Sequence, residues 1–158
     1  TDQEILIPDA YVESITERLS LYTRLDNCET EEELQAFAAE LQDRFGPVPP
    51  QVTDLFNTVR SRKLAVELGF EKMILKDEEL KCYFINRPDS PYFESETFHN
   101  ILSYIQTRTN KARLKQVGKM FMLVVDDVKN MEQVVTFLRR MHSEVVSQAK
   151  AGAAAQRG

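Results

Sequence analysis

Residues 40–50, with the sequence ELQDRFGPVPP, decide how the first half of this chain folds. A predicted helix ends at Phe45, because Gly46 can adopt the left-handed backbone conformation that terminates helices. Pro49 and Pro50 prevent the helix from continuing, and they favour a new helix start because its first N–H groups need no helical partner. The stretch therefore predicts two helices joined by a short turn that fixes the angle between them.

The residues before this turn predict two helices. In the first, Asp9 is a suitable N-cap, and apolar residues recur at spacings of three and four to form one buried stripe: Val12, Ile15, Leu19 and Tyr22. The second helix begins at Thr30, where Glu33 completes a capping box that satisfies two N–H groups.

After the turn, a third helix is predicted from about Pro50 to Leu68, ended by Gly69. Its apolar side chains are expected to face one way: Val52, Leu55, Phe56, Val59 and Val66. This helix is expected to be the most buried of the three.

The character of the sequence then changes to short β-prone runs. Residues 72–76 and 80–85 predict one hairpin, and residues 112–117 and 120–125 predict another around Gly118. The run 120–125 is apolar throughout, so we expect a central strand that is covered on both faces. A fourth helix is expected to begin near Ser95, and Asn130 is the expected cap of a last one.

These elements predict an α+β fold: an N-terminal three-helix part, then a small antiparallel sheet of two hairpins with two packed helices. We expect residues 1–148 to form one domain or two tightly joined lobes, with a helical part over about 9–69 and a sheet part over about 70–148. Residues 149–158 are dominated by Ala and Gly without an apolar stripe, which predicts a disordered tail.

The length and net charge of the chain limit the class of protein to which it can belong. The 158 residues suit one domain, and the net charge of −5 argues against nucleic-acid binding as the main function. Cys28 and Cys82 are expected to be free buried thiols. No apolar run approaches the roughly 18 residues of a membrane span. The chain begins at Thr1 rather than Met, so we expect a piece of a longer, cytoplasmic polypeptide.

The sequence shows no catalytic motif. His99 and His142 lie on predicted helices without a second ligand at helical spacing, which favours surface positions over metal or base roles. Asp126 and Asp127 end a strand and could hold Mg²⁺, but a strand-to-helix connection explains them better because no companion ligands are visible. We therefore expect no catalytic, cofactor or metal site in this chain.

Two basic groups have two possible explanations. One lies on the third helix and one alternates along a strand, so that its members should point to one side of the sheet; they are Arg60, Arg62 and Lys63, and Lys111, Arg113 and Lys115. They could contact phosphates of a nucleic acid. Charge on the solvent side of an edge strand, which blocks strand addition, is the explanation we favour.

Two further groups could contact a partner. Tyr92 and Phe93 could anchor an interaction, but a lid folded onto the core is favoured. Glu40, Asp43 and Arg44 cluster at one helix end, where Glu40 and Arg44 can pair across one turn. They could form a weak surface salt bridge or a rigid set of charges that faces a partner, and composition does not separate these alternatives.

Three motifs, however, resemble a known family. They are IPDAYV over residues 7–12, RLSLYTRL over 18–25 and ELQDRFGPVP over 40–49. Together they resemble the C-terminal domain of the bacterial transcription-repair coupling factors (Mfd), strongly over about the first seventy residues and only in pattern over the sheet half.

The resemblance implies a regulatory role without catalysis. Members of that family are ATP-dependent DNA translocases that displace stalled RNA polymerase and recruit excision repair, with ATP and Mg²⁺ bound in motor domains outside this piece. The implied partner is the N-terminal UvrA-binding module of the same parent chain, and contacts with UvrA, RNA polymerase and DNA would be indirect. By position in the motif, Glu40, Asp43 and Arg44 are the implied docking charges, with Phe45 behind them. An accessory nucleic-acid-binding domain using the two basic groups is the alternative.

Overall fold

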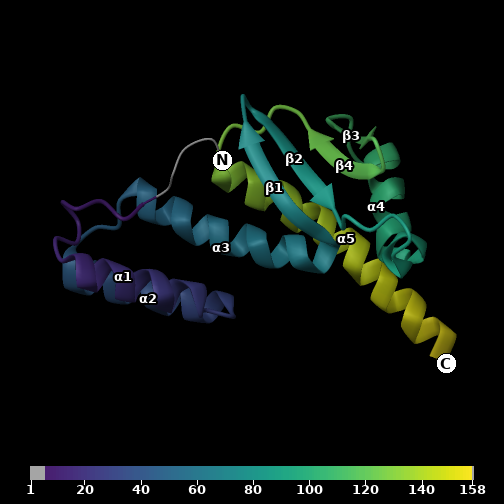
Figure 1. The fold of residues 1–158 in the computed structure, drawn as a ribbon. Helices are drawn as coiled ribbons and strands as arrows, with labels where there is room; N and C mark the ends of the chain where they lie inside the picture. Colours follow the sequence, from purple (N-terminus) through teal and green to yellow (C-terminus); the bar gives the residue numbers. More distant parts are fainter. Residues whose placement is uncertain (1–5, 158) are drawn as a thin grey trace. The chain divides into compact units, whose positions relative to one another are not determined.

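A computed structural model describes residues 6–157, with side chains for residues 6–146. The described chain forms two compact units, residues 6–60 and residues 61–157. The division falls inside the third helix, α3 (Pro50–Leu68), rather than at its end as the sequence suggested. Figure 1 shows the elements in chain order.

The first unit, hereafter the helical unit, contains α1 (Ile15–Asp26), α2 (Glu31–Phe45) and the first part of α3. Its core is apolar and includes Leu21, Leu34, Leu41, Val52 and Phe56. The predicted cap of α2 is confirmed, because the Thr30 hydroxyl accepts from the Glu33 N–H at 3.1 Å. The Glu33 carboxylate accepts from the N–H of Glu29, one residue earlier than a capping box requires.

The start of α1 was predicted incorrectly. The helix is capped by Ser14, whose hydroxyl accepts from the Glu17 N–H at 3.2 Å, and not by Asp9. Asp9 lies instead in a turn closed by hydrogen bonds from Tyr11 and Val12 to the Pro8 carbonyl. Ser, like Asp, is a strong N-cap, so propensity alone cannot choose between the two.

The predicted buried stripe was correct for Val12, which is 2% exposed, and for Tyr22, which packs against the core, but wrong for Ile15 and Leu19. Ile15 and Leu19 are 66% and 61% exposed, whereas Leu21 and Leu25 are buried. Two apolar stripes overlap on this helix, and only packing against the rest of the unit selects the inward one. The same reason applies to Val66 on α3, which was expected in the core but is 71% exposed.

The second unit, hereafter the sheet unit, contains four antiparallel strands in the order β1-β2-β4-β3. The strands are β1 (Phe70–Lys76), β2 (Glu79–Phe84), β3 (Ala112–Val117) and β4 (Met120–Val125). Asp77 and Glu78 join β1 to β2 with φ of 52° and 61°, as a tight hairpin turn requires. Both predicted hairpins are confirmed, and their strands form one sheet.

The helices of the sheet unit are α4 (Glu96–Thr107), α5 (Met131–Arg157) and a short 3-10 helix η1 (Pro91–Glu94). Figure 1 shows α5 crossing behind β1 and β2, on the same side of the sheet as α4. As predicted, β4 is central, and its last four residues are buried on both faces. The α+β prediction is therefore confirmed.

The end of the chain differs from expectation. Helix α5 continues through residues 149–157, where a disordered tail was predicted. Alanine has the highest helix propensity of all residues, so an Ala-rich segment can extend an existing helix without an apolar face.

Tyr92 and Phe93 form the predicted lid. Both are half-buried, and both rings pack against Phe84 and Phe98. The Tyr92 hydroxyl donates to the Leu68 carbonyl. Gly69 has φ of 95°, and a Cβ there would lie 2.3 Å from the Tyr92 ring. Only glycine satisfies both the backbone conformation and this close approach.

Candidate docking surface

The charged end of α2 is tied to α1 by an ion-pair chain. Arg24 of α1 donates to both carboxylate oxygens of Glu40, at 2.6 and 2.8 Å. Arg44 donates to the same carboxylate at 3.4 Å and also pairs with Glu17 of α1. We call these four residues, Glu17, Arg24, Glu40 and Arg44, the helix-end network. It joins the two helices along one side and leaves its members 35% to 44% exposed.

Two members of this network were not predicted. The pairing of Glu40 with Arg44 within α2 was expected, but Glu17 and Arg24 come from another helix, 27 and 16 residues away in sequence from their partners. Their spacing of seven on α1 was the available signal, because it places both on one face of a helix.

The strongest electrostatic effect in the network falls on Glu40. The two hydrogen bonds from Arg24, with a smaller contribution from Arg44, lower the pKa of this carboxyl from 4.5 to about 2. Because this group is solvent-exposed, water screens the interaction, and the network is better evidence for orientation than for large stabilisation.

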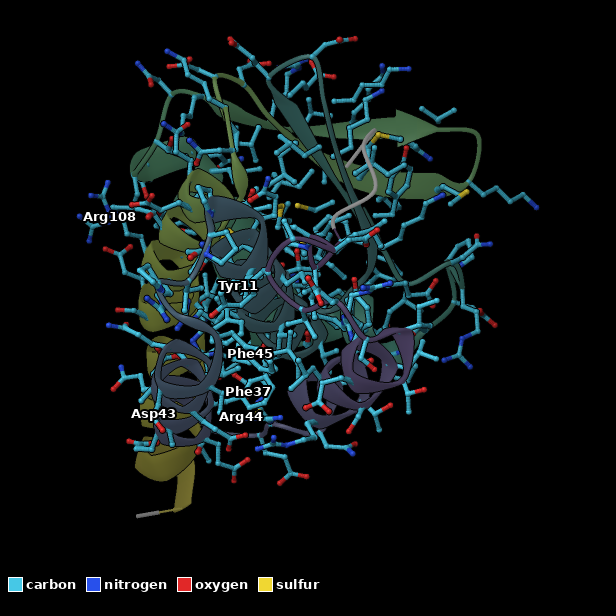
Figure 2. All side chains as sticks on the ribbon, turned by 90° about the vertical axis from the view of Figure 1, so that its left-hand side faces the viewer. Tyr11, Phe37, Asp43, Arg44, Phe45 and Arg108 are labelled. Carbon is cyan, nitrogen blue, oxygen red and sulfur yellow. The ribbon has the colours of Figure 1, made fainter. Side chains whose placement is uncertain are left out.

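Aromatic side chains also fix the position of the C-terminal end of α2. The Tyr11 hydroxyl donates to the carbonyls of Leu41 and Gly46, at 3.1 and 2.9 Å, and its ring lies 5.7 Å from that of Phe45. The Arg44 guanidinium lies 4.7 Å above the Phe45 ring. Figure 2 shows Tyr11, Phe45 and Arg44 at this end of the helical unit. The predicted support of the charges by Phe45 is consistent with these contacts.

Gly46 has φ of 92° and ψ of −169°. This region is accessible essentially to glycine alone, although it is not the left-handed helical conformation that the sequence suggested. The N–H of Gly46 donates to the Gln42 carbonyl at 3.0 Å. The helix end is therefore fixed by a backbone conformation, a tyrosine and two arginines.

Asp43 is the exception among the three predicted docking residues. It is exposed, and within residues 6–146 its carboxylate makes no hydrogen bond or ion pair. In Figure 2 it extends to the side of α2 opposite Arg44. The structure thus separates a free carboxylate from two charges held by internal partners.

The first basic group does not form one surface. Arg60 binds Glu31 through two hydrogen bonds of 3.0 and 2.8 Å and also donates to Asn57, so its guanidinium joins α3 to α2. Arg62 is exposed. Lys63 is half-buried, and its ammonium has no hydrogen-bond partner in the described part of the chain.

The second basic group is also divided. Arg113 pairs with Asp126 at 2.6 Å and with Glu79 at 3.6 Å. Lys111 was expected beside it, but it precedes β3, and its ammonium lies 5.7 Å from the Phe137 ring of α5. Lys115 is exposed and has no ion pair among the described residues. The prediction that all three point to one side of the sheet is therefore wrong for Lys111.

The remaining candidates for chemistry have structural partners. His142 contacts Glu67, His99 Nδ1 lies 2.8 Å from the Ser95 carbonyl oxygen, and Cys28 and Cys82 are buried, as predicted, and are not joined by a disulfide. Among the described residues, no three His, Cys, Asp or Glu side chains gather as a possible metal site. No described helix is long and apolar enough to cross a membrane.

Comparisons with known proteins place this geometry in context. The model of the TRCF domain family matches residues 1–95. The transcription-repair-coupling factor of Rickettsia conorii is 29% identical over 116 residues, which cover 73% of this chain and 10% of that protein. That of Escherichia coli K12 is 38% identical over 68 residues, 43% of this chain and 6% of that protein. The chain therefore spans only about a tenth of the length of these relatives.

A solved structure extends the similarity beyond the matched residues. The crystal structure of a C-terminal domain of transcription-repair coupling factor covers 93% of this chain, and this chain covers 92% of it, with a TM-score of 0.74. At 18% sequence identity, this similarity shows a common fold.

Proposed function

Because the chain belongs to the TRCF domain family, we propose that it is a non-catalytic regulatory domain that docks reversibly on another module of a transcription-coupled repair translocase. The proposed partner is the N-terminal module that binds UvrA, and docking would cover the UvrA-binding surface and restrain the ATPase motor. The domain would need neither ATP nor a metal of its own, since those belong to the motor.

The observation that supports docking is the contrast between Asp43 and the charges beside it. A free carboxylate lies next to a helix end whose other charges are already oriented by the helix-end network. Orienting charges before contact lowers the entropy lost on association. A partner that presents a cation to Asp43 would therefore bind a surface whose other charges are already held in place.

A polar surface also suits a reversible contact between domains, here called the latch. Interfaces between domains of one chain are more polar than permanent ones, and relative motion is their default behaviour. A docked state that hides the UvrA site and an undocked state that exposes it would then exchange according to what else is bound.

The first test is a calorimetric titration of this chain against the separately expressed UvrA-binding module. Asp43→Arg should abolish or strongly weaken binding, because it reverses a charge that has no internal role. Glu32→Lys is the matched control: it reverses an exposed acid on the same helix, eleven residues or roughly 16 Å away.

A second variant separates docking from folding. Asp43→Asn removes the free charge without reversing it and has no internal ion pair to lose among the described residues, so it should weaken docking while thermal stability changes little. In the longer parent protein, both variants should raise basal ATPase activity and UvrA affinity. Unchanged ATPase activity and unchanged UvrA affinity in both variants would show that the latch proposal is wrong.

A further inference from the structure

The face of the sheet opposite α4 and α5 has an ordered arrangement of side chains. Directly paired residues of antiparallel strands share a face, which places two cross-strand rows on this side, here called the open face. One row is Ile74, Lys81, Val124 and Arg113, and the other is Lys72, Tyr83, Met122 and Lys115. In Figure 1 this face points away from α5.

Cations dominate the edges of the open face. Lys72 and Lys76 are exposed on the edge strand β1, and Arg113 and Lys115 are exposed on the opposite edge strand β3. Glu79 is within 3.9 Å of Lys81 and 3.6 Å of Arg113. Within the described residues, the other three ammonium groups, on Lys72, Lys76 and Lys115, have no ion pair. In a chain of net charge −5, this concentration of unpaired positive charge on one face favours a polyanionic ligand.

The centre of the open face is apolar and aromatic. Val124 and Met122 are buried, at 1% and 7% exposed, so the accessible group at the centre is half-buried Tyr83, which lies directly across from Met122. Beside Tyr83 is a hollow of about 300 Å³, lined by Ile74, Lys76, Asp77, Glu79, Lys81 and Tyr83. A flat aromatic group bordered by a hollow can accept the face of a nucleobase.

The dimensions suit a single strand. Lys72 and Lys115 stand at the two ends of one row, about 14 Å apart across three strand spacings, with Tyr83 between them. Arg113 and Lys115 are about 7 Å apart along β3. A chain of phosphates with unstacked bases could contact the edge cations while a base stacks on Tyr83. A duplex keeps its bases stacked internally and could use only the cations.

We infer that the open face binds single-stranded nucleic acid, with Lys72 and Lys115 contacting phosphates and Tyr83 stacking on a base. The Lys72 ammonium now lies 5.4 Å from the centre of the Tyr83 ring, so it moves from the ring to a phosphate on binding. This surface belongs to the sheet unit and uses none of the residues of the proposed docking surface, so either proposal can fail without the other.

The test is fluorescence anisotropy of this chain with a labelled oligothymidylate of about 12 nucleotides, repeated over a range of salt concentrations. The Lys72→Gln, Lys115→Gln double variant should weaken binding and reduce the slope of log affinity against log salt by about 1.4, since each phosphate contact contributes about 0.7. Tyr83→Leu should weaken binding at least about five-fold with the slope unchanged, and Tyr83→Phe should bind like the unaltered chain.

Arg140→Gln is the matched control for charge, because Arg140 is exposed on α5, which lies on the other side of the sheet. It should leave affinity and slope close to those of the unaltered chain. Circular dichroism melting of each variant verifies that the sheet is folded.

Three results would overturn the inference. They are no binding at low salt, an affinity insensitive to both the double variant and Tyr83→Leu, or duplex binding as tight as single-strand binding and equally insensitive to Tyr83→Leu. Binding of polyglutamate that matches the oligonucleotide and survives Tyr83→Leu would assign the face to acidic peptides instead.

Discussion

The charged end of α2 and the open face of the sheet use the same residue types in opposite ways. In the helical unit, arginines and glutamates pair with one another: Glu17, Arg24, Glu40 and Arg44 form a chain of ion pairs beside the free carboxylate of Asp43. On the sheet, Lys72, Lys76 and Lys115 have no anion within the described residues. The difference teaches that charge density alone does not identify a binding surface: charges that are paired internally orient a surface, and charges left unpaired are available to a partner.

The largest expected effect concerns the core that supports the helix-end network. Leu41→Ala should destabilise the chain by about 2 to 5 kcal/mol, because Leu41 is 1% exposed and its truncation leaves a cavity. Leu19→Ala on the 61% exposed side of α1 is the control and should change stability by less than about 0.5 kcal/mol. Urea unfolding measures both. Equal losses would mean that the inward face of α1 has been misassigned.

The next effect concerns the glycine that ends α2. Gly46→Ala should cost about 1 to 3 kcal/mol, because alanine is strained at φ of 92° and ψ of −169°. Steric contact would not be the cause, since no atom lies within 4 Å of an added Cβ. Gly118→Ala provides a comparison on the sheet, where a Cβ also meets nothing within 4 Å at φ of 62°. If Gly46→Ala has no effect on thermal unfolding, the helix end is not fixed by its backbone.

A smaller effect is expected in the pH dependence of stability, which tests whether the helix-end network exists in solution. The pKa of Glu40 is lower in the folded chain, about 2 against 4.5, so its contribution to stability is present above about pH 4.5 and is lost as the pH falls towards 2. Glu40→Gln should therefore reduce the acid sensitivity of the free energy of unfolding across this window, measured by urea unfolding at several pH values. Glu32→Gln, which removes a carboxylate without an arginine partner, should leave the acid sensitivity nearer to that of the unaltered chain. The reverse order would mean that the network does not persist in solution.

The smallest effect should come from the sheet cations. Lys115→Gln should change stability by less than about 0.5 kcal/mol, because its ammonium has no ion pair to lose, and Lys72→Gln by less than about 1 kcal/mol, because it loses only the cation–π contact with Tyr83. Arg113→Gln breaks contacts with Asp126 and Glu79 and is the informative comparison in thermal melts. A large loss with Lys115→Gln would show that this side chain supports the sheet rather than facing a ligand.

Local sequence signals predicted much of this fold correctly. Thr30, Ser95 and Asn130 each cap the helix that was expected after them, and both hairpins formed around their predicted turns. The motif over residues 40–49 also indicated the family from the sequence alone, and the match to the TRCF domain confirms that resemblance. These signals succeed because a cap, a turn or a short motif depends on residues close together in sequence.

The features that the sequence did not predict depend on contacts between residues that are far apart in the chain. The spacing of α1 permitted two buried faces, and packing against α2 and α3 chose Leu21 and Leu25 over Ile15 and Leu19. Arg24 lies 16 residues from Glu40, and no local rule pairs them. Three strand pairings, β1 with β2, β2 with β4 and β4 with β3, placed Lys72 and Lys115 on one face, although more than forty positions separate them along the chain. The sequence alone thus determined most of the elements and the family, whereas the tertiary structure decided which charges are paired, because pairing depends on distance in space.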